Sequence, residues 1–357
     1  MASKKIITVS APGKIHFLGE HVVVHGKPAL IAAIDKRLRI TLTPRSDKQI
    51  EIVSQNSKQS IITSGVNILE MTKKAQAQWK RFLLTNEITF LTSMTSELLS
   101  YPLIAIGETL LFYKKRLPSG FTITIDSAIP LGSGLGSSAA LSVTIAAAVS
   151  LFLGEKIDTQ KIYDIALVTE QKKHGRPSGG DPAVVLHGGL VWFRRETQNL
   201  KIIEPVPFSI SEKIAHHFSM IDTGKPEEST GEMIATVKQF MDTDPSANDV
   251  FDDQERLTRE MLDAIKNEDE KGIINIIKQG QRNLEKMGVV SIFVKKLIRE
   301  IEKSGGAAKI SGGGGKKKGA GMLLVYHPNS KRLDTIVQSS TLQAHKIYLG
   351  GEGLIIE

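Results

Sequence analysis

The segment Pro130-Leu-Gly-Ser-Gly-Leu-Gly-Ser-Ser-Ala-Ala140 follows a predicted strand and opens a predicted helix. The strand is Phe121–Asp126, where apolar and polar residues alternate, and the helix is Ser137–Leu153, which is rich in small apolar residues. Glycines allow backbone N–H groups to approach an anion, and a helix N-terminus adds about half a positive charge. The segment therefore predicts a phosphate-binding loop, with Ser137 and Ser138 placed to hold phosphate oxygens or Mg²⁺.

Two common nucleotide-binding patterns do not fit this loop. No lysine follows its last glycine, as the P-loop of nucleoside triphosphatases requires, and the loop lacks the acidic partner of a dinucleotide-binding fingerprint. A glycine turn that simply precedes a buried helix is the alternative interpretation.

The composition is that of an ordinary globular protein, with 41% hydrophobic and 24% charged residues. At 357 residues the chain exceeds what one hydrophobic core usually serves, so we expect two domains, residues 1–200 and 201–357. The absence of cysteine excludes disulfides, thiolate zinc sites and cysteine nucleophiles, and is compatible with a cytoplasmic protein. No apolar stretch has the length expected of a membrane span or of a signal-peptide core.

The net charge of +8, from 46 Lys and Arg against 38 Asp and Glu, favours anionic ligands. Aromatic residues make up only 5% of the chain and the basic residues are dispersed, so no stacking platform for a nucleic acid is visible. We therefore expect small molecules that carry phosphate or carboxylate groups as partners, and neither nucleic acid nor a membrane.

Strands and helices alternate without long parallel βαβ runs, so the sequence predicts an α+β fold. In the first half we expect strands Ile6–Ser10, Leu38–Thr43, Ile50–Val53, Phe121–Asp126, Val184–Leu186 and Leu190–Arg194, with helices from about Ile68 and at Ser96–Arg116, Ser137–Leu153 and Asp158–Lys172. In the second half we expect strands Phe218–Asp222, Ala307–Ser311, Gly321–His327 and His345–Leu349, with helices Glu228–Met241, Asp249–Lys266, Lys271–Met287, Ser291–Ser304 and one from Ser330.

Three ordered segments resemble the motifs of the GHMP kinases, the superfamily of galactokinase, homoserine kinase, mevalonate kinase and phosphomevalonate kinase. Pro130–Ala140 resembles the central motif, and Ala307–Gly315 lies where the family has its C-terminal glycine motif. Ser10-Ala-Pro-Gly-Lys-Ile-His-Phe-Leu-Gly-Glu-His-Val-Val-Val-His-Gly26 resembles the N-terminal motif in the form typical of mevalonate kinases. It lacks the Arg-Asn and Glu-His-Thr-Asp pattern of galactokinases. The resemblance implies a two-domain GHMP kinase fold, with an N-terminal domain like domain 2 of ribosomal protein S5 and a ferredoxin-like C-terminal domain.

The segment Glu170-Gln-Lys-Lys-His-Gly-Arg-Pro-Ser-Gly-Gly-Asp-Pro-Ala183 is similar to a His-Gly-x-Pro-Ser-Gly-x-Asp string of mevalonate kinases. Its proline and glycines indicate a tight turn just before Asp181. The resemblance implies that Asp181 is the catalytic carboxylate and that Glu170 binds the metal. Two carboxylates with separate tasks suit phosphoryl transfer, because one can hold Mg²⁺ while the other orients or deprotonates the hydroxyl group. Pro182 stands where the family usually has Asn.

The resemblance also implies roles for residues of the other motifs. Lys14 would lie near the transferred phosphate, where a compact cation suits developing negative charge. Glu20 and His21 would contact the acceptor alcohol together with Lys14 and Asp181. Ser138 would join Glu170 at the metal. The phosphates of ATP would be bound by the central loop, through Pro130, Gly132, Ser133, Gly134, Leu135, Gly136, Ser137 and Ser138.

The loop after the strand Phe218–Asp222 leaves two interpretations open. Thr230 matches a threonine thought to bind mevalonate in the family. Ser229 or Thr230 could instead cap the helix that follows, and the two interpretations are compatible.

The C-terminal glycine motif departs from the family pattern. Gly312, Gly313 and Gly314 still form a loop whose amides could approach a phosphate. Three lysines, Lys316, Lys317 and Lys318, follow where the family has small neutral residues. They are either a solvated part of the loop or a group from which one ammonium reaches the triphosphate.

The resemblance implies transfer of the γ-phosphate of ATP to the 5-hydroxyl of (R)-mevalonate, a step of isoprenoid precursor biosynthesis. It implies Mg²⁺, ATP and mevalonate as ligands, and family members are often homodimers. Another GHMP kinase, acting on phosphomevalonate or at C1 of a sugar, is the alternative within the superfamily. A non-catalytic binding protein of the same fold is a further alternative, but it would be expected to lack Lys14, Glu170 or Asp181, and all three are present.

Overall fold

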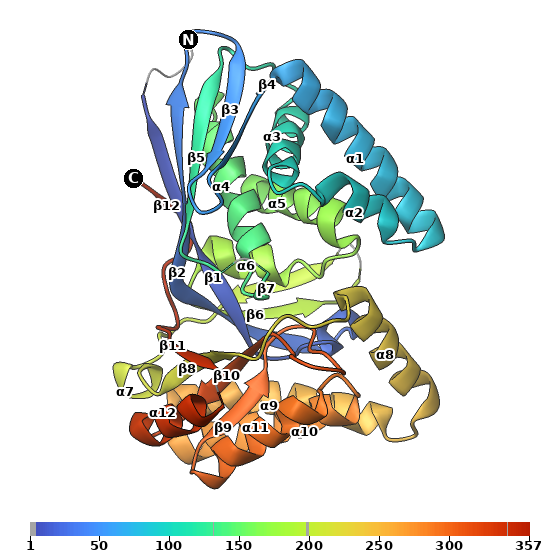
Figure 1. The fold of residues 1–357 in the computed structure, drawn as a ribbon, viewed down its shortest axis with the longest axis vertical. Coiled ribbons are helices and arrows are strands. Elements are labelled where there is room, and N and C mark those ends of the chain that lie inside the picture. The colour runs from blue at the N-terminus through green and yellow to red at the C-terminus, as the bar shows by residue number, and fades with distance from the viewer. Residues whose placement is uncertain (1–4, 131, 198–199, 341) are drawn as a thin grey trace.

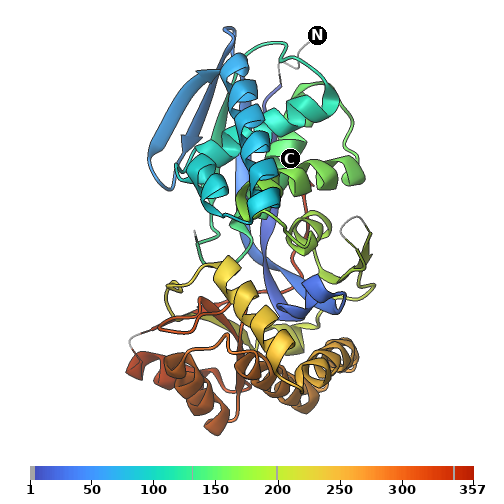
Figure 2. The same cartoon turned by 90° about the vertical axis from the view of Figure 1, so that its right-hand side faces the viewer.

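Two β-sheets, each with helices packed against it, build the molecule (Figure 1). The structure, a computed structural model, describes residues 5–130, 132–197, 200–340 and 342–357. In the view of Figure 1 the larger sheet and its helices lie above the smaller sheet. The same division is seen after a 90° turn in Figure 2. Among the described residues, no helix combines the length and apolar character that a membrane crossing requires.

The larger sheet has eight strands within the described residues, and its main path runs β12-β1-β2-β5-β3-β4. Strand β6 also pairs with β2, and β7 with β6. All pairs are antiparallel except β3 with β5. The strands are β1 (Ile7–Leu18), β2 (Pro28–Pro44), β3 (Gln49–Ser54), β4 (Gln59–Ser64), β5 (Phe121–Ser127), β6 (Leu190–Arg195), β7 (Lys201–Pro205) and β12 (Ile355–Ile356).

Helices cover one face of this sheet, on the right in Figure 1. The helices of this part are the short 3-10 helix η1 (Val22–His25), α1 (Gly65–Thr85), α2 (Thr89–Thr95), α3 (Ser100–Tyr113), α4 (Ser137–Phe152), α5 (Thr159–His174) and α6 (Gly180–His187). Helix α4 packs against β1 and β2 on one side and against α3, α5 and α6 on the others. It is therefore the central element of the larger unit.

Helix α4 can occupy this central place because its residues are small or apolar and none is charged. Its buried residues include the small Ala146, Ala147 and Ala148, which allow close approach of its neighbours. The buried hydroxyls bond within the helix, as when Thr144 Oγ1 donates to the Ala140 carbonyl (2.7 Å). Ser150 Oγ donates to the Ala146 carbonyl (2.6 Å) in the same way. The N-terminus of α4 is thus held firmly at the edge of the core.

The smaller sheet has the order β11-β8-β10-β9, and all its pairs are antiparallel. Along the chain the pattern is strand, helices, two strands, helix and strand, which is the βαββαβ arrangement of ferredoxin-like domains. The elements of this part are α7 (Glu212–Ala215), β8 (Phe218–Asp222), α8 (Thr230–Thr243), α9 (Ala247–Lys266), α10 (Glu270–Lys286), α11 (Ile292–Lys303), β9 (Ala307–Ile310), β10 (Met322–Tyr326), α12 (Ser330–Ser339) and β11 (Gln343–Lys346).

The predicted elements agree with these in most places, with three informative differences. Val184–Leu186, predicted as a strand, lies within α6, so that prediction is wrong. A three-residue apolar run does not distinguish a buried helix from a strand, and this one is helical. The helix predicted at Ser96–Arg116 begins only at Ser100, which leaves Pro102 in its first turn, where proline is tolerated. Strands β4, β7 and β12 were not predicted, because they are short and carry little apolar alternation.

The C-terminal segment returns from the smaller sheet to the larger one. Ile355 and Ile356 pair with Ser10 and Val9 of β1. Leu349 forms a bridge with Ile34, and Glu352 forms one with Gly188. Strands β7 and β12 both follow residue 200 in the chain, yet both belong to the larger sheet. The domain division at residue 200 stays a sequence-based prediction.

Gly188 makes the closest approach to this returning segment. Its backbone has φ 74° and ψ −169°, a region that is almost restricted to glycine. A Cβ atom there would lie 2.2 Å from the backbone nitrogen of Gly353. We expect Gly188→Ala to lower the free energy of unfolding by about 2–3 kcal/mol, measured by urea denaturation.

The neighbouring Gly189 provides a matched control for this prediction. It also has a positive φ, 61°, but a Cβ atom would meet nothing within 4 Å. Gly189→Ala should therefore cost only about 1 kcal/mol. Equal losses for the two variants would mean that the returning segment does not press on Gly188.

Candidate active site

The glycine loop and strand β1 are in direct backbone contact. The backbone N–H of Lys14, in β1, donates to the carbonyl of Leu135 (2.9 Å). Gly136 has φ 77° and caps the start of α4, and a Cβ atom at this position would lie 2.6 Å from Cγ of Lys14. The aliphatic part of Lys14 therefore occupies the space beside residue 136, and its ammonium group is brought to the N-terminal end of α4.

Lys14, His16 and Asp181 form one polar cluster. Lys14 Nζ lies 3.0 Å from Asp181 Oδ2, and His16 Nε2 lies 3.3 Å from Asp181 Oδ1. Asp181 is in the first turn of α6, while Lys14 and His16 belong to β1 and are two residues apart along it. The side chain of Lys14 is only 5% exposed, whereas that of Asp181 is 32% exposed. A ligand can thus reach the carboxylate of Asp181 more easily than the ammonium of Lys14.

The Asp181 carboxylate is held in its ionised form. Burial by itself would raise its pKa, but the charge of Lys14 and the hydrogen bond and charge of His16 outweigh burial and hold the pKa well below its usual range. Asp181 is therefore negatively charged at any pH at which the protein is expected to be folded.

Ser138 and Glu170 lie side by side at the start of α4. Ser138 Oγ donates to Glu170 Oε2 (3.2 Å) and also lies 3.2 Å from Nε2 of His174. The other oxygen of Glu170 accepts a hydrogen bond from the hydroxyl of Tyr101, whose pKa is raised well above its ordinary value by burial and by the Glu170 charge. Tyr101 thus stays a donor and orients Glu170 with one oxygen toward Ser138.

This pair of oxygen ligands fits a magnesium ion that is bound mainly by phosphates and water. Mg²⁺ in nucleotide sites takes only one or two protein carboxylates, so Ser138 and Glu170 could hold it. Among the described residues, no group of three or more acidic or histidine side chains is arranged to hold a metal.

Glu20 and His21 connect the N-terminal motif to the smaller sheet. The Glu20 carboxylate is buried, and its Oε1 accepts a hydrogen bond from Nζ of Lys309 in β9. Its Oε2 has no hydrogen-bond partner among the described residues. His21 Nε2 lies 3.1 Å from the carbonyl oxygen of Gly313. The contact of these two residues with an acceptor stays a prediction.

The N-terminus of α8 supports one of the two interpretations of its sequence. The Ser229 side chain accepts from the backbone N–H of Glu232 (3.3 Å), and Glu232 accepts in turn from the Ser229 backbone N–H (2.7 Å). Ser229 is therefore the N-cap of a capping box. Helix α8 begins at Thr230, but the side chain of Thr230 lies outside what the structure describes. Its contact with mevalonate also stays a prediction.

The C-terminal glycine loop, Ser311–Gly315, lies against the N-terminal motif. The backbone N–H of His16 donates to Ser311 Oγ (3.0 Å), and Gly313 contacts His21 as described above. Of the three lysines that follow, Lys317 and Lys318 lie 3.7 and 3.1 Å from Glu227 and are largely exposed. This pairing favours the solvated interpretation for these two lysines.

Several residues of the site were not predicted from the sequence. His16 lies in the N-terminal motif, and its position two residues after Lys14 on a strand was the available signal. Lys309 interrupts an otherwise apolar strand, which indicates a buried charge with a partner. Tyr101 gave no local signal, because its contact with Glu170 joins α3 to α5.

A cavity of about 270 Å³ opens beside the glycine loop and was also not predicted. Its lining is mostly apolar, with a few polar groups from β3, the β3–β4 turn and the start of α4. The lining residues are Leu38, Ser54, Asn56, Leu98, Leu99, Pro102, Ile125, Ser127, Ala128, Ile129, Pro130, Ser137 and Leu141. A ligand that joins a planar apolar group to a chain of phosphates could bind with the planar group in this cavity and the phosphates at the glycine loop.

His21 should make stability depend on pH. Burial lowers its pKa to about 4, although Glu20 and the Gly313 carbonyl oppose the shift. Between pH 6.5 and pH 4 the unfolded chain binds a proton that the folded chain does not, so stability falls as pH falls. Between pH 7 and pH 4, we expect wild type to lose up to about 3 kcal/mol more unfolding free energy than His21→Gln.

The exposed His345 serves as the control for this titration. His345→Gln should follow the wild-type pH dependence in urea denaturation. A wild-type curve that runs parallel to the His21→Gln curve would contradict burial of a neutral imidazole at this position.

Comparisons with known proteins agree with this arrangement. Residues 104–189 match the family described as GHMP kinases N terminal domain. A mevalonate kinase of Archaeoglobus fulgidus is 31% identical over 85% of this chain and 87% of its own length. A mevalonate kinase of Schizosaccharomyces pombe is 29% identical over 99% of this chain and 92% of its own. The solved structure of the Methanococcus jannaschii mevalonate kinase superimposes with a TM-score of 0.75, at 19% identity, over 98% of this chain and 99% of that one.

The solved structure shares the fold, which confirms the predicted α+β, two-domain GHMP kinase architecture. The sequence identity, which extends over most of both chains, carries the assignment further. This chain belongs to the mevalonate kinase family of the GHMP kinases.

Proposed function

We propose that this protein is an ATP-dependent mevalonate kinase, which transfers the γ-phosphate of ATP to the 5-hydroxyl of (R)-mevalonate. The observation that carries the proposal is the ion pair of Lys14 with Asp181, located at the glycine loop that opens α4. When an alcohol attacks a phosphoryl group, a carboxylate beside the alcohol and a cation beside the phosphoryl group both favour the reaction.

In the proposed reaction the alcohol oxygen forms a bond to the γ-phosphorus while the bond from that phosphorus to the β–γ bridging oxygen breaks, and ADP leaves. Lys14 lies where it can neutralise charge on the transferred group. The backbone amides at the start of α4 and the hydroxyls of Ser137 and Ser138 would hold phosphate oxygens. Holding both reactants in line is the main task of the protein in phosphoryl transfer.

Asp181 is better suited to orient the hydroxyl group than to remove its proton early. A carboxylate whose pKa is held well below its usual range is a weak base. Its Oδ atoms can still accept a hydrogen bond from the alcohol. They can also stabilise the positive charge that develops on the alcohol as its oxygen bonds to phosphorus and its proton becomes more acidic. The proton would then pass to an Oδ atom of Asp181 late, after the bond to phosphorus has begun to form.

We place Mg²⁺ at Ser138 and Glu170. Ser138 and Glu170 would hold the ion, which would supply positive charge to offset that of the ATP phosphates. Tyr101 would keep the Glu170 carboxylate in place, since its hydroxyl donates to the oxygen that does not face Ser138. We place the adenine base of ATP in the cavity beside Pro130 and Ser137.

The remaining parts of this proposal rest on the family resemblance. They are a cytoplasmic location, a role in isoprenoid precursor biosynthesis and a homodimeric form. The contacts of mevalonate with Glu20, His21 and Thr230, and of phosphate with Gly312, Gly313 and Gly314, belong to the same group of proposals.

The acceptor is tested by measuring ADP release with mevalonate, phosphomevalonate, homoserine and galactose in parallel. We expect kcat/KM to be highest for mevalonate by at least tenfold. Turnover of another alcohol with mevalonate inert would replace the substrate but keep the phosphotransferase. Failure of every alcohol, with ATP still bound, would instead support a non-catalytic binding protein.

Asp181→Asn should lower kcat by about 10²-fold or more, because the amide keeps the size of the side chain but loses its charge and its basic site. The affinity for ATP should change little. Asp334→Asn, an exposed substitution on α12, is the matched control and should keep wild-type kinetics. If Asp181→Asn retained activity within threefold of wild type, Asp181 would have no part in the mechanism.

Glu170→Gln should raise the Mg²⁺ concentration needed for half-maximal rate, since a neutral amide is a poor ligand for a hard cation. The measurement is initial rate against Mg²⁺ at saturating ATP and acceptor. Glu70→Gln, on the exposed side of α1, controls for the loss of one negative charge. An unchanged Mg²⁺ dependence in Glu170→Gln would remove Glu170 from the metal site.

A further inference from the structure

Strand β9 contains a fully buried lysine. All four residues Ala307–Ile310 are buried, and the side chain of Lys309 is 0% exposed. Its Nζ donates to Oε1 of Glu20 and to the carbonyl oxygen of Ile310 (2.7 Å). A charge is found in such a place only when it is paired and hydrogen-bonded, as this one is.

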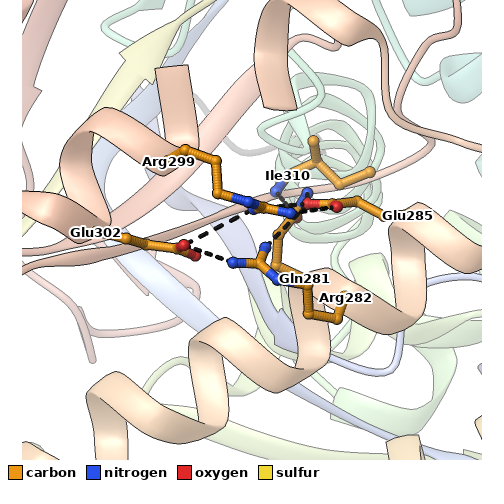
Figure 3. Close-up of polar contacts among 6 residues, drawn as sticks. All are labelled: Gln281, Arg282, Glu285, Arg299, Glu302 and Ile310. Atoms are coloured by element: carbon orange, nitrogen blue, oxygen red, sulfur yellow. Dashed lines mark hydrogen bonds and ion pairs between the residues drawn. The ribbon is translucent and has the colours of Figure 1, made fainter. Parts of the chain in front are cut away.

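The backbone N–H of Ile310, whose carbonyl oxygen binds Lys309, is hydrogen-bonded to a different side chain. Gln281 of α10 is fully buried, and its Oε1 accepts from the Ile310 backbone N–H (3.1 Å). Figure 3 shows Gln281 reaching from Ile310 toward Glu285, whose Oε1 accepts from Gln281 Nε2 (3.2 Å). Side chains thus bind both backbone polar groups of Ile310: Gln281 accepts from its N–H, and Lys309 donates to its carbonyl oxygen.

An ion-pair network fixes the position of Glu285 in turn. Arg299 donates to both of its oxygens (3.1 and 2.6 Å), and Arg282 donates to its Oε1 (3.0 Å). Arg282 also donates to Glu302 of α11 (Figure 3). This polar network of α10 and α11 therefore reaches the last residue of β9 through Gln281.

Ile310 is the residue that immediately precedes the glycine loop Ser311–Gly315. The Ile310 side chain also limits the loop directly, because a Cβ atom at Gly314 would lie 2.7 Å from its Cδ1. On the far side, the loop is bound to the N-terminal motif through Ser311 and Gly313. A shift of Ile310 would therefore move the loop relative to Lys14 and Asp181.

We propose that Lys309 and Gln281 are positioning residues of the active site: together they fix Ile310, and through it the glycine loop, against the N-terminal motif. Lys309 does so through Glu20, which makes the Glu20–Lys309 pair a link between the two sheets. Lys309 is not a ligand for substrate in this arrangement, since it is fully buried and its ammonium is already bound by Glu20 and Ile310. The role in catalysis rests on the function proposed above, whereas the placement of the loop does not.

The test combines steady-state kinetics with hydrogen exchange of the loop amides, followed by mass spectrometry. The variants are Lys309→Met, Gln281→Met, and Lys309→Met combined with Glu20→Gln. For both single variants we expect exchange at residues 311–315 to become at least tenfold faster. We expect kcat to fall at least tenfold, because a small displacement of a positioning element costs that much in rate.

The double variant tests the link between the sheets. Removing one member of a buried pair leaves an uncompensated charge, and removing both relieves it. Loop exchange in the double variant should therefore be slower than in Lys309→Met alone. Loop exchange in the double variant that is as fast as in Lys309→Met, or faster, would overturn the proposal that Lys309 and Glu20 act as a pair.

Arg299→Met is the matched control for a merely structural role. It weakens the same network at Glu285 but leaves the bond between Gln281 and Ile310 in place, because Arg282 still contacts Glu285. It should lower the melting temperature while loop exchange and kcat stay within threefold of wild type.

Two outcomes separate this proposal from the proposed function. Unchanged loop exchange in both Lys309→Met and Gln281→Met would overturn the positioning role, whatever the substrate is. Faster exchange in a protein that phosphorylates none of the alcohols would support the placement of the loop and reject the kinase function.

Discussion

The contact between Lys14 and the start of helix α4 is the constraint on which the site depends. Only a glycine at position 136 leaves room for the lysine stem, and only a buried α4 holds the helix N-terminus still. Because Lys14 passes through this narrow space, its ammonium can pair with Asp181 from α6. Strand β1, the start of α4 and the start of α6 are far apart in sequence but thereby lie within a few ångströms of one another. The remaining residues of the site stabilise this arrangement.

Local sequence predicted the parts of the site that are local. The central loop and the start of α4 follow from glycine spacing, and the tight turn before Asp181 follows from its proline and glycines, whereas the role of Asp181 came from the family resemblance. Most helices and strands of the second half were also predictable, because the helices are amphipathic and the strands are apolar, whereas their ferredoxin-like arrangement was expected from the family resemblance. The resemblance to a known family supplied the expected roles, which composition and periodicity alone do not give.

The features that could not be predicted join distant elements. Tyr101 in α3 orients Glu170 in α5, and Lys309 in β9 meets Glu20 in the turn after β1. Neither contact leaves a periodic signal in the sequence, since each depends on how whole units pack. The cavity beside Pro130 is of the same kind, because its walls come from strands and helices that are separated by up to a hundred residues. Short edge strands such as β12 were missed for a related reason, as their pairing is decided by the partner strand.

The return of the C-terminal segment to β1 has a consequence for how this chain is made. Strand β1 is synthesised before the smaller unit, yet the strand that pairs with its outer edge is synthesised after that unit. During translation, at roughly 5–20 residues per second, that edge stays unpaired for many seconds while the intervening residues emerge. An exposed strand edge is a template for pairing with other chains. Nascent chains on neighbouring ribosomes therefore carry an edge of β1 that is open to pairing with another chain.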